Sequence, residues 1–305
     1  MVTNHNDIVS EIMDLKKEKK AVFLVHNYQR PEVQDLADFV GDSLELSQKA
    51  AKTEAEVIVF CGVHFMAETA FLVNPGKTVL LPELESGCPM ADMITVEKLI
   101  AKKKEIPGVL VVCYVNSSAA VKAESDICCT SANAVRVVQS LPSDREILFI
   151  PDQYLGQWVA QKTGREMHLW PGYCPTHMKI MGKKILEEKR KHPAALALVH
   201  PECRPDAKEA ADQVLSTGGM IRYVRESPAQ EFIIGTETGI IHRLKKENPG
   251  KIFIPVNVKA VCPNMKKITL TKVLQALQKM QYQVTVPKSI QEKALSAVNR
   301  MLAIG

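Results

Sequence analysis

The polar and apolar positions of the chain form a pattern that occurs three times. Each time a helical, lysine-rich stretch precedes a short apolar run, and a second helical stretch precedes a second apolar run. Short apolar runs between helical stretches indicate buried strands in parallel βαβ units. The first runs are Val22–Val25, Leu110–Cys113 and Leu196–Val199, and the second runs end near Cys61, Ile150 and Ile234.

The three segments keep one register, which marks them as an internal repeat. The residues that directly follow the first runs lie 88 residues apart (26 to 114) and then 86 residues apart (114 to 200). The same offsets recur for the residues two positions further on and again for an Asp-x4-Ser/Thr pattern. Each segment closes on a Cys-Pro pair. These sets are His26, Tyr114 and His200; Tyr28, Asn116 and Glu202; Asp38…Ser43, Asp126…Ser131 and Asp212…Thr217; and Cys88-Pro89, Cys174-Pro175 and Cys262-Pro263.

The repeat predicts an α/β fold of three similar small domains, each a parallel sheet flanked by helices. We expect them to be arranged with pseudo-threefold symmetry around a central site, because ligands bind beyond the carboxyl ends of parallel strands, where the repeated polar residues lie. The predicted domains cover residues 1–90, 91–176 and 177–264. Residues 265–305 indicate a helix, a strand at 282–286 and a second helix, packing on the first or third domain.

The composition narrows the functional classes. Of the 305 residues, 46% are hydrophobic and 24% are charged, and the net charge is +5, as in an ordinary globular protein. The lysine runs lack interleaved aromatic residues, so we expect solvated helix faces and no nucleic-acid partner. No segment has the length of a membrane span, and residues 1–7 lack a signal-peptide pattern. The sequence therefore predicts a cytoplasmic protein with no membrane partner.

The eight cysteines divide into groups by their register. Cys61, Cys113 and Cys128 stand where the other repeats have Val or Ile, so we expect them to be small buried core residues, and Cys129 to be structural as well. Cys203 lies in a loop that should face the site, which makes it the one rival ligand. The Cys-Pro thiols, in contrast, occupy the same position in all three repeats.

Three converging thiolates indicate a metal cofactor. They are too few to close a four-coordinate structural zinc site, and zinc ribbons use local Cys-x2-Cys pairs that this chain lacks. Iron–sulfur clusters normally take four thiolates. Three would leave one iron open to substrate as a Lewis acid, which suits dehydration or carbonyl polarisation. We therefore predict one cluster held by Cys88, Cys174 and Cys262.

Ten ordered motifs, between about Ala21 and Lys267, resemble those of the quinolinate synthase family. The resemblance implies a [4Fe–4S] enzyme that condenses iminoaspartate with dihydroxyacetone phosphate to quinolinate for NAD biosynthesis, with loss of phosphate and two waters. It also implies the three Cys-Pro ligands, one iron not ligated by protein, and a functional link to an L-aspartate oxidase or dehydrogenase. The motifs are His26-Asn27-Tyr28-Gln29, Gly41-Asp42-Ser43, Cys88-Pro89-Met90, Tyr114-Val115-Asn116-Ser117, Cys129-Thr130-Ser131-Ala132-Asn133, Cys174-Pro175-Thr176-His177, His200-Pro201-Glu202-Cys203, Ser216-Thr217-Gly218, Gly235-Thr236-Glu237 and Asn264-Met265-Lys266-Lys267.

The polar residues of these motifs fit that chemistry. The hydroxyls of Ser43, Ser131 and Ser216/Thr217 stand where new helices should start, as helix caps do, and helix N-termini favour the carboxylate and phosphate groups of the substrates. Histidines can hold anions or move protons near neutral pH. The predicted catalytic residues are Glu202, as general base or as a ligand near the open iron, Tyr28, which assists phosphate loss or triose isomerisation, and His200. The predicted substrate-binding residues are His26, Ser43, Tyr114, Asn116, Ser131, His177, His200, Glu202, Ser216 and Thr217.

The repeat by itself leaves two alternative classes of protein open. The diphthamide-forming and diphosphate-reducing iron–sulfur enzymes share the three-domain, three-cysteine arrangement. A zinc-binding structural protein is the alternative outside enzymes. The His-Asn-Tyr motif at residue 26 and the His-Pro-Glu-Cys motif at residue 200 favour quinolinate synthase.

Overall fold

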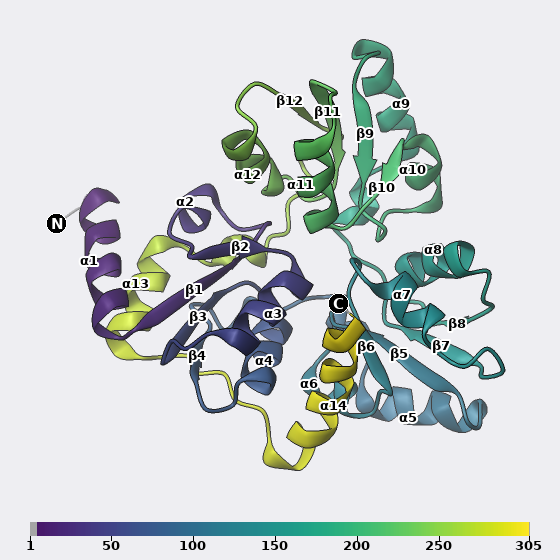
Figure 1. Cartoon of the computed structure of the whole chain (residues 1–305), viewed down its shortest axis with the longest axis horizontal. Helices are drawn as coiled ribbons and strands as arrows, with labels where there is room; N and C mark the ends of the chain where they lie inside the picture. The colour runs from purple at the N-terminus through teal and green to yellow at the C-terminus, as the bar shows by residue number, and fades with distance from the viewer. Residues whose placement is uncertain (1–4, 305) are drawn as a thin grey trace.

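Three four-stranded parallel sheets form the body of the molecule, seen in purple, blue-teal and green in Figure 1. The computed structural model describes residues 5–304, so residues 1–4 of the predicted first domain, and residue 305, lie outside the described part. The strand orders are β2-β1-β3-β4, β6-β5-β7-β8 and β10-β9-β11-β12, the same order three times. The predicted fold class is thereby confirmed, whereas the exact domain limits stay a prediction.

The elements follow one another in the same sequence in each repeat. The first comprises α1 (His5–Glu18), β1 (Ala21–His26), α2 (Pro31–Gln34), β2 (Phe39–Gly41), α3 (Ser43–Lys52), β3 (Val57–Cys61), α4 (His64–Val73) and β4 (Thr78–Leu80). The second comprises η1 (Ala91–Met93), α5 (Val96–Glu105), β5 (Leu110–Tyr114), α6 (Ala119–Ala123), β6 (Ile127–Cys129), α7 (Ala134–Gln139), β7 (Ile147–Ile150), α8 (Gln153–Thr163) and β8 (His168–Leu169). The third comprises η2 (His177–Lys179), α9 (Gly182–Lys191), β9 (Leu196–Val199), α10 (Pro205–Ala210), β10 (Gln213–Val214), α11 (Thr217–Glu226), β11 (Glu231–Gly235), α12 (Ile240–Glu247) and β12 (Ile252–Pro255). The chain closes with η3 (Met265–Lys267), α13 (Leu270–Lys279) and α14 (Lys288–Ile304).

The two central strands of each sheet are mostly apolar and buried, as expected of parallel strands with helices on both faces. Every residue of β3 and of β7 is buried. In each sheet the first and third strands of the repeat are neighbours, as β1 and β3 are, and their connections run to opposite edges. Such a switch point opens a crevice beyond the carboxyl ends of the two strands, and the residues after β1, β5 and β9 lie there.

The repeated aspartates have one structural role in all three sheets. Each aspartate precedes the edge strand. Its backbone N–H donates to the carbonyl oxygen of one residue in the first strand, and its carboxylate accepts from the N–H of that same residue. The carboxylate accepts at 2.7 Å in each case, from the N–H of Phe23, Val111 and Ala197. Because a buried backbone N–H needs a partner, Asp38, Asp126 and Asp212 fix where the edge strand begins.

The cap of α3 differs from our expectation that Ser43 would fill this position. Asp42 is the N-cap: its Oδ1 accepts from the backbone N–H groups of Leu44 and Glu45, both at 3.0 Å. The Glu45 carboxylate accepts in return from the Asp42 N–H at 2.9 Å, which completes a capping box. Ser43 is therefore the first residue of the helix, and its hydroxyl is not used as the cap. Ser131 is not a cap either, because α7 begins three residues after it.

The C-terminal segment packs against elements of the first and second domains. Helix α13 lies against α1, whereas α14 lies against α6 and β6 of the second sheet and α4 of the first (Figure 1). Its buried face includes Ala294, Val298 and Met301. The strand expected at 282–286 is reduced to one antiparallel bridge, between Leu80 and Gln283. Packing of α14 on the second sheet could not be derived from its apolar spacing, which defines a face but not its partner.

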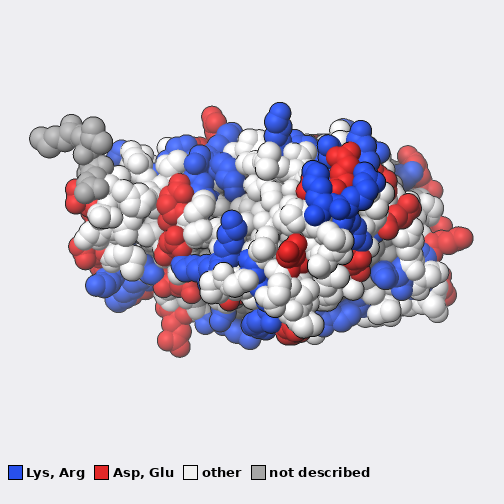
Figure 2. All heavy atoms as spheres, turned by 90° about the horizontal axis from the view of Figure 1, so that it is seen from above, with Lys and Arg blue, Asp and Glu red and all other residues white. Residues whose placement is uncertain are grey.

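Charged side chains of both signs mix on the face shown in Figure 2. On the lysine-rich helix α9, Lys184, Lys189 and Lys191 pair with Glu187, Asp212 and Glu188 at 2.7, 2.8 and 2.8 Å. Within residues 5–304, no helix combines the length and apolar character that crossing a membrane requires.

Candidate active site

One central cavity of about 70 Å³ collects residues from all three sheets. Its walls come from the loops that follow β1, β5 and β9 and from the three Cys-Pro loops. Almost every residue predicted for the site lines it: His26, Tyr28, Ser43, Cys88, Tyr114, Asn116, Ser131, Cys174, His177, His200, Glu202, Thr217 and Cys262. The exception is Ser216, whose Oγ caps α11 by accepting from the Gly219 N–H at 3.1 Å. The repeat register thus corresponds to a shared location in space.

The three Cys-Pro thiols differ from the other five in their access to the cavity. Cys88, Cys174 and Cys262 are partly exposed, and the other cysteines are buried. Each precedes a short turn, η1, η2 or η3, and backbone N–H groups at the start of that turn favour the thiolate form of the cysteine. Burial raises the pKa of all three thiols, and at Cys88 and Cys174 the charges of the neighbouring cysteines add to the effect; for Cys88 the pKa is about 12.

These features fit an iron–sulfur cluster. Thiolates crowded in a low-dielectric site are unfavourable unless a cation neutralises them, and backbone N–H groups aimed at the sulfurs are a common way to stabilise cluster thiolates. A single-ion site is a weaker match. Cys174, His177 and Glu202 are the one group of potential metal ligands within 4.8 Å of one another among the described residues. That group omits Cys88 and Cys262, although both line the same cavity.

The remaining cysteines belong to the core of the domains. Cys61 lies in β3, Cys113 in β5, and Cys128 and Cys129 in β6, all in buried strand positions. Cys203, the rival ligand, is fully buried, and its thiol donates to the carbonyl oxygen of Gly235 at 3.4 Å. Its sulfur is thus turned toward β11 instead of the cavity.

His26 and His200 are neutral donors that face the cavity. In both, Nδ1 accepts a backbone N–H from two residues further on, at 3.2 Å from Tyr28 and 3.3 Å from Glu202. The pKa of each ring is lowered to about 3, mainly by burial, and at His26 the charge of Lys266 contributes to this lowering. Because Nδ1 accepts, the neutral ring carries its hydrogen on Nε2. At His200 this nitrogen lies 3.1 Å from the hydroxyl of Ser131.

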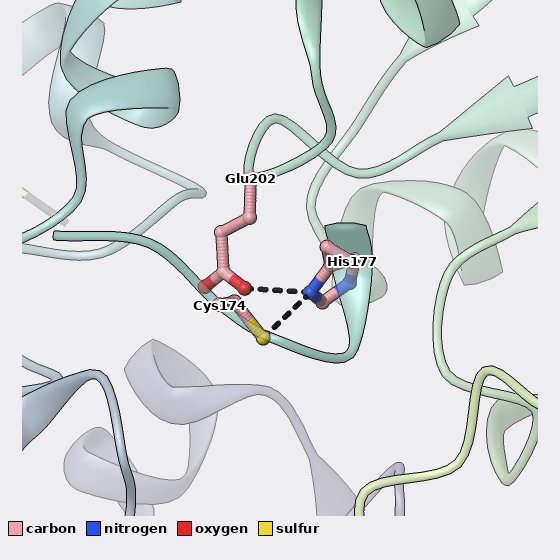
Figure 3. Close-up of side chains that lie close together, drawn as sticks. All are labelled: Cys174, His177 and Glu202. Atoms are coloured by element: carbon pink, nitrogen blue, oxygen red, sulfur yellow. Dashed lines mark hydrogen bonds and ion pairs between the residues drawn. The ribbon is translucent and has the colours of Figure 1, made fainter. Parts of the chain in front are cut away.

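Glu202 lies where residues of two sheets meet (Figure 3). Its Oε2 is 2.7 Å from Nδ1 of His177, and Tyr114 donates to its Oε1 at 2.5 Å. The same His177 nitrogen is 3.1 Å from Sγ of Cys174. Burial works to raise the pKa of Glu202, but His177, His200 and the Tyr114 hydroxyl outweigh burial and lower the pKa to about 2. The side chain is therefore a carboxylate, able only to accept hydrogen bonds.

The hydroxyl and amide groups of the cavity are placed to receive an anion. Ser43 and Thr217 are the first residues of α3 and α11, where helix N–H groups favour negative charge. Asn116 supplies the clearest sign of a missing partner. Its Oδ1 is buried and has no hydrogen-bond partner in the described chain. A buried amide oxygen without a donor is costly, so a ligand that donates a hydrogen bond fits here.

Sequence reasoning gave no individual role to three residues that shape this site. Thr236 contacts both Tyr28 and His177, at 2.5 and 2.8 Å. Glu237 accepts from the Cys262 N–H at 3.1 Å, and its carboxylate also pairs with Lys266 at 3.1 Å. Thr236 and Glu237 directly follow β11. The carboxyl end of the second apolar run in each repeat was therefore the signal that could have found them.

Comparisons with known proteins place the chain among quinolinate synthases. The sequence profile of one family, described as quinolinate synthetase A protein, matches residues 10–303. The quinolinate synthase of Desulforudis audaxviator (strain MP104C) is 58% identical over 299 residues, which cover 98% of this chain and 99% of the relative. Quinolinate synthase 1 of Methanosarcina acetivorans is 55% identical over 298 residues, 98% of each chain. The quinolinate synthase of Geobacter metallireducens is 57% identical over 297 residues, 97% of each chain.

Proposed function

The chain belongs to the family of quinolinate synthetase A proteins, and from this premise we propose that it is the enzyme that forms quinolinate from iminoaspartate and dihydroxyacetone phosphate. Phosphate and two waters leave, which balances the atoms of the two substrates against the pyridine dicarboxylate. The product serves NAD biosynthesis. The observation that carries the proposal is the meeting of one Cys-Pro thiol from each repeat with Glu202 and Tyr28 in a single cavity.

We propose that Cys88, Cys174 and Cys262 hold a [4Fe–4S] cluster with one iron not ligated by protein. Three thiols along one cavity, each backed by N–H groups, support this ligand set. When bound, such a cluster supplies a Lewis acid that polarises an oxygen of the substrate. Glu237 holds the Cys262 backbone, and His177 contacts the Cys174 sulfur, so the chain orients two of the three ligands through neighbours.

Glu202 is the group best placed to accept a proton. Its two oxygens already have partners, His177 and Tyr114, and this pairing keeps its pKa low. A carboxylate of such low pKa is a weak base. A substrate that displaces either partner removes one stabilising hydrogen bond, and the basicity of Glu202 then rises at the moment when it is needed. His177, stacked on His200 with ring centroids 4.8 Å apart, is placed to take part in the same proton movements.

Groups from all three domains would bind the carboxylate and phosphate groups of the substrates. Ser43 and Thr217 offer helix N-termini, and neutral His26 offers an Nε2–H donor. Asn116 offers amide N–H groups that can donate to an anion, and its Oδ1, unpartnered within the described chain, can accept from an N–H or O–H group of the substrate. The Tyr28 hydroxyl lies among them and is placed to assist loss of phosphate or isomerisation of the triose. Together these groups would recognise carboxylate and phosphate without a fixed positive charge at the reacting atoms.

Iminoaspartate must be supplied by oxidation of aspartate, and an L-aspartate oxidase or dehydrogenase is the partner that we propose. The test is anaerobic turnover of the iron- and sulfide-reconstituted protein with aspartate, an aspartate oxidase and dihydroxyacetone phosphate, followed by chromatographic detection of quinolinate. We expect quinolinate only when all components are present. Absence of quinolinate from a brown, cluster-loaded preparation would refute the proposed reaction. A colourless preparation that contains zinc would favour the structural alternative.

A further inference from the structure

Thr236 is a buried hydroxyl between two functional side chains of different sheets. It directly follows β11, is 1% exposed, and belongs to the third repeat. Its Oγ1 lies 2.5 Å from the phenol oxygen of Tyr28, in the first repeat, and 2.8 Å from Nε2 of His177. The mechanism outlined above assigns it no part, although it is the direct contact between the Tyr28 hydroxyl and the His177–Glu202 pair.

The Thr236 hydroxyl can serve both neighbours whether the His177 ring is neutral or protonated. Nδ1 of His177 faces the Glu202 carboxylate at 2.7 Å, and an ionised carboxylate only accepts, so Nδ1 carries a hydrogen. In the neutral ring Nε2 is then an acceptor. In that state Thr236 donates its hydrogen to Nε2, whereas in a protonated ring Nε2–H donates to Thr236; in both states the Thr236 lone pairs can accept from Tyr28. A single hydroxyl therefore satisfies both neighbours, and valine, which has the same shape, satisfies neither.

The Tyr28 loop is already held by groups of the third repeat and of the C-terminal segment. Lys266 donates to the carbonyl oxygens of Tyr28 and Gln29, and Asn27 contacts Thr217 at 3.1 Å. These contacts hold the main chain and leave the phenol free to turn about its side-chain bonds. Thr236 is the hydrogen-bond partner that the structure shows for the phenol itself.

We propose that Thr236 is a positioning residue that fixes the Tyr28 phenol and the His177 ring relative to one another. Loss of its hydroxyl leaves the fold and the cysteines in place but lets the phenol leave the reacting position. Misplacement of a catalytic group by about 1 Å can cost about 10² in rate. The part of this inference that concerns rate rests on the proposed function, whereas the part that concerns the Tyr28 orientation does not.

The test compares Thr236→Val, which removes the hydroxyl, with Thr236→Ser, which keeps it. Each is measured in the full-length protein for quinolinate formation, bound iron and melting temperature, with Thr236→Ala as the second hydroxyl-free variant should the valine protein not fold. We expect Thr236→Val to keep its iron and lose about 10² in kcat, with KM changed much less, and Thr236→Ser to stay within about 3-fold of the parent. Equal rates for the parent and a folded hydroxyl-free variant would overturn the proposal.

A second readout does not depend on turnover. Incorporation of 3-fluorotyrosine gives fluorine NMR signals from the six tyrosines, and Tyr28→Phe assigns the one from Tyr28. In protein without a cluster we expect Thr236→Val to shift or split this signal and Thr236→Ser to leave it unchanged. An unchanged Tyr28 signal in Thr236→Val would contradict positioning even if activity fell. Lack of quinolinate formation by the parent would sink the proposed function alone, because the fluorine measurement would still decide about Thr236.

A double-variant cycle separates action through Tyr28 from an independent effect. If Thr236 works by holding the phenol, adding Thr236→Val to Tyr28→Phe should lower the rate by much less than it does in the parent. Losses that multiply in full would show that Thr236 acts elsewhere and would overturn the inference.

Discussion

Tyr114 and Glu202 meet across the boundary between the second and third sheets, where the phenol donates to Oε1 of the carboxylate at 2.5 Å. Tyr114 ends β5, and Glu202 follows β9, so two repeats each contribute one member of the pair. The other oxygen of Glu202 faces His177 at 2.7 Å. A buried carboxylate with a partner on each oxygen is held in one orientation, as proton transfer at a defined atom requires.

Replacement of Glu202 by glutamine should therefore affect chemistry more than folding. Glu202→Gln keeps the shape and removes the charge, and general acid–base groups contribute about 10² to 10⁴ in rate. We expect a loss of that size in kcat, with the cluster retained. Tyr28→Phe should behave in the same way. Glu209→Gln, an exposed change on α10, is the matched control and should turn over normally. Normal turnover by Glu202→Gln would remove this residue from the mechanism.

The three Cys-Pro thiols should be required for iron, and the core thiols should not. Alanine at Cys88, Cys174 or Cys262 removes a thiolate that faces the cavity, so bound iron and sulfide should fall steeply in anaerobically reconstituted protein. Cys128→Ala, in a buried strand position of β6, is the control and should keep the parent content of iron. If this control loses iron as completely as Cys174→Ala does, the ligand assignment is wrong.

Asn116 should contribute to substrate affinity through its amide. The Asn116 NH2 group can donate to a substrate carboxylate or phosphate, and a hydrogen bond to a charged group is worth about 1.5 to 3 kcal/mol, so Asn116→Ala should raise the KM of the anionic substrate that it contacts by about 10- to 100-fold. Asn116→Asp retains an acceptor oxygen but adds a negative charge. We expect its KM to rise further, because the charge repels carboxylate and phosphate. Steady-state kinetics with each substrate varied in turn checks this prediction, and parent-like KM values for both variants would contradict it.

His26 and His200 should each make the cluster-free protein less stable as the pH is lowered below about 6.5, the ordinary pKa of histidine. Burial lowers the pKa of His26 and His200 to about 3, so between these values the unfolded chain binds protons that the folded chain does not. Unfolding then becomes easier as pH falls, by about 1.4 kcal/mol per pH unit for each histidine. Urea unfolding at pH 7, 6 and 5 measures the slope. His26→Gln should flatten it, and a slope identical to that of the parent would argue against burial as the cause.

The spacing of the three repeats predicted which residues lie together in the site better than it predicted how the helices and domains pack. Because equivalent positions in repeated sheets end at one edge, the common spacing of His26, Tyr114 and His200 was enough to place them together. The same argument separated Cys88 from Cys61 and Cys203. These predictions rest on local pattern and symmetry, which the sequence contains in full.

Contacts between domains could not be read from the chain, because they depend on how the three sheets meet. Nothing in the apolar spacing of α14 indicates that it lies against α6, and nothing near Tyr28 points to Thr236, more than 200 residues away. The cap of α3 was missed for a simpler reason. Asp42 and Ser43 are both good N-cap residues, and only the helix start decides between them.

The most direct test of a three-thiol cluster with one open iron is Mössbauer spectroscopy of protein reconstituted with iron-57. Spectra are recorded anaerobically before and after addition of quinolinate, which should bind where it is formed. The account predicts that one of the four irons has its own signal and that this signal alone changes when the ligand is added. Four irons that stay indistinguishable and unaffected by quinolinate would contradict the account, as would iron that is not in a cluster.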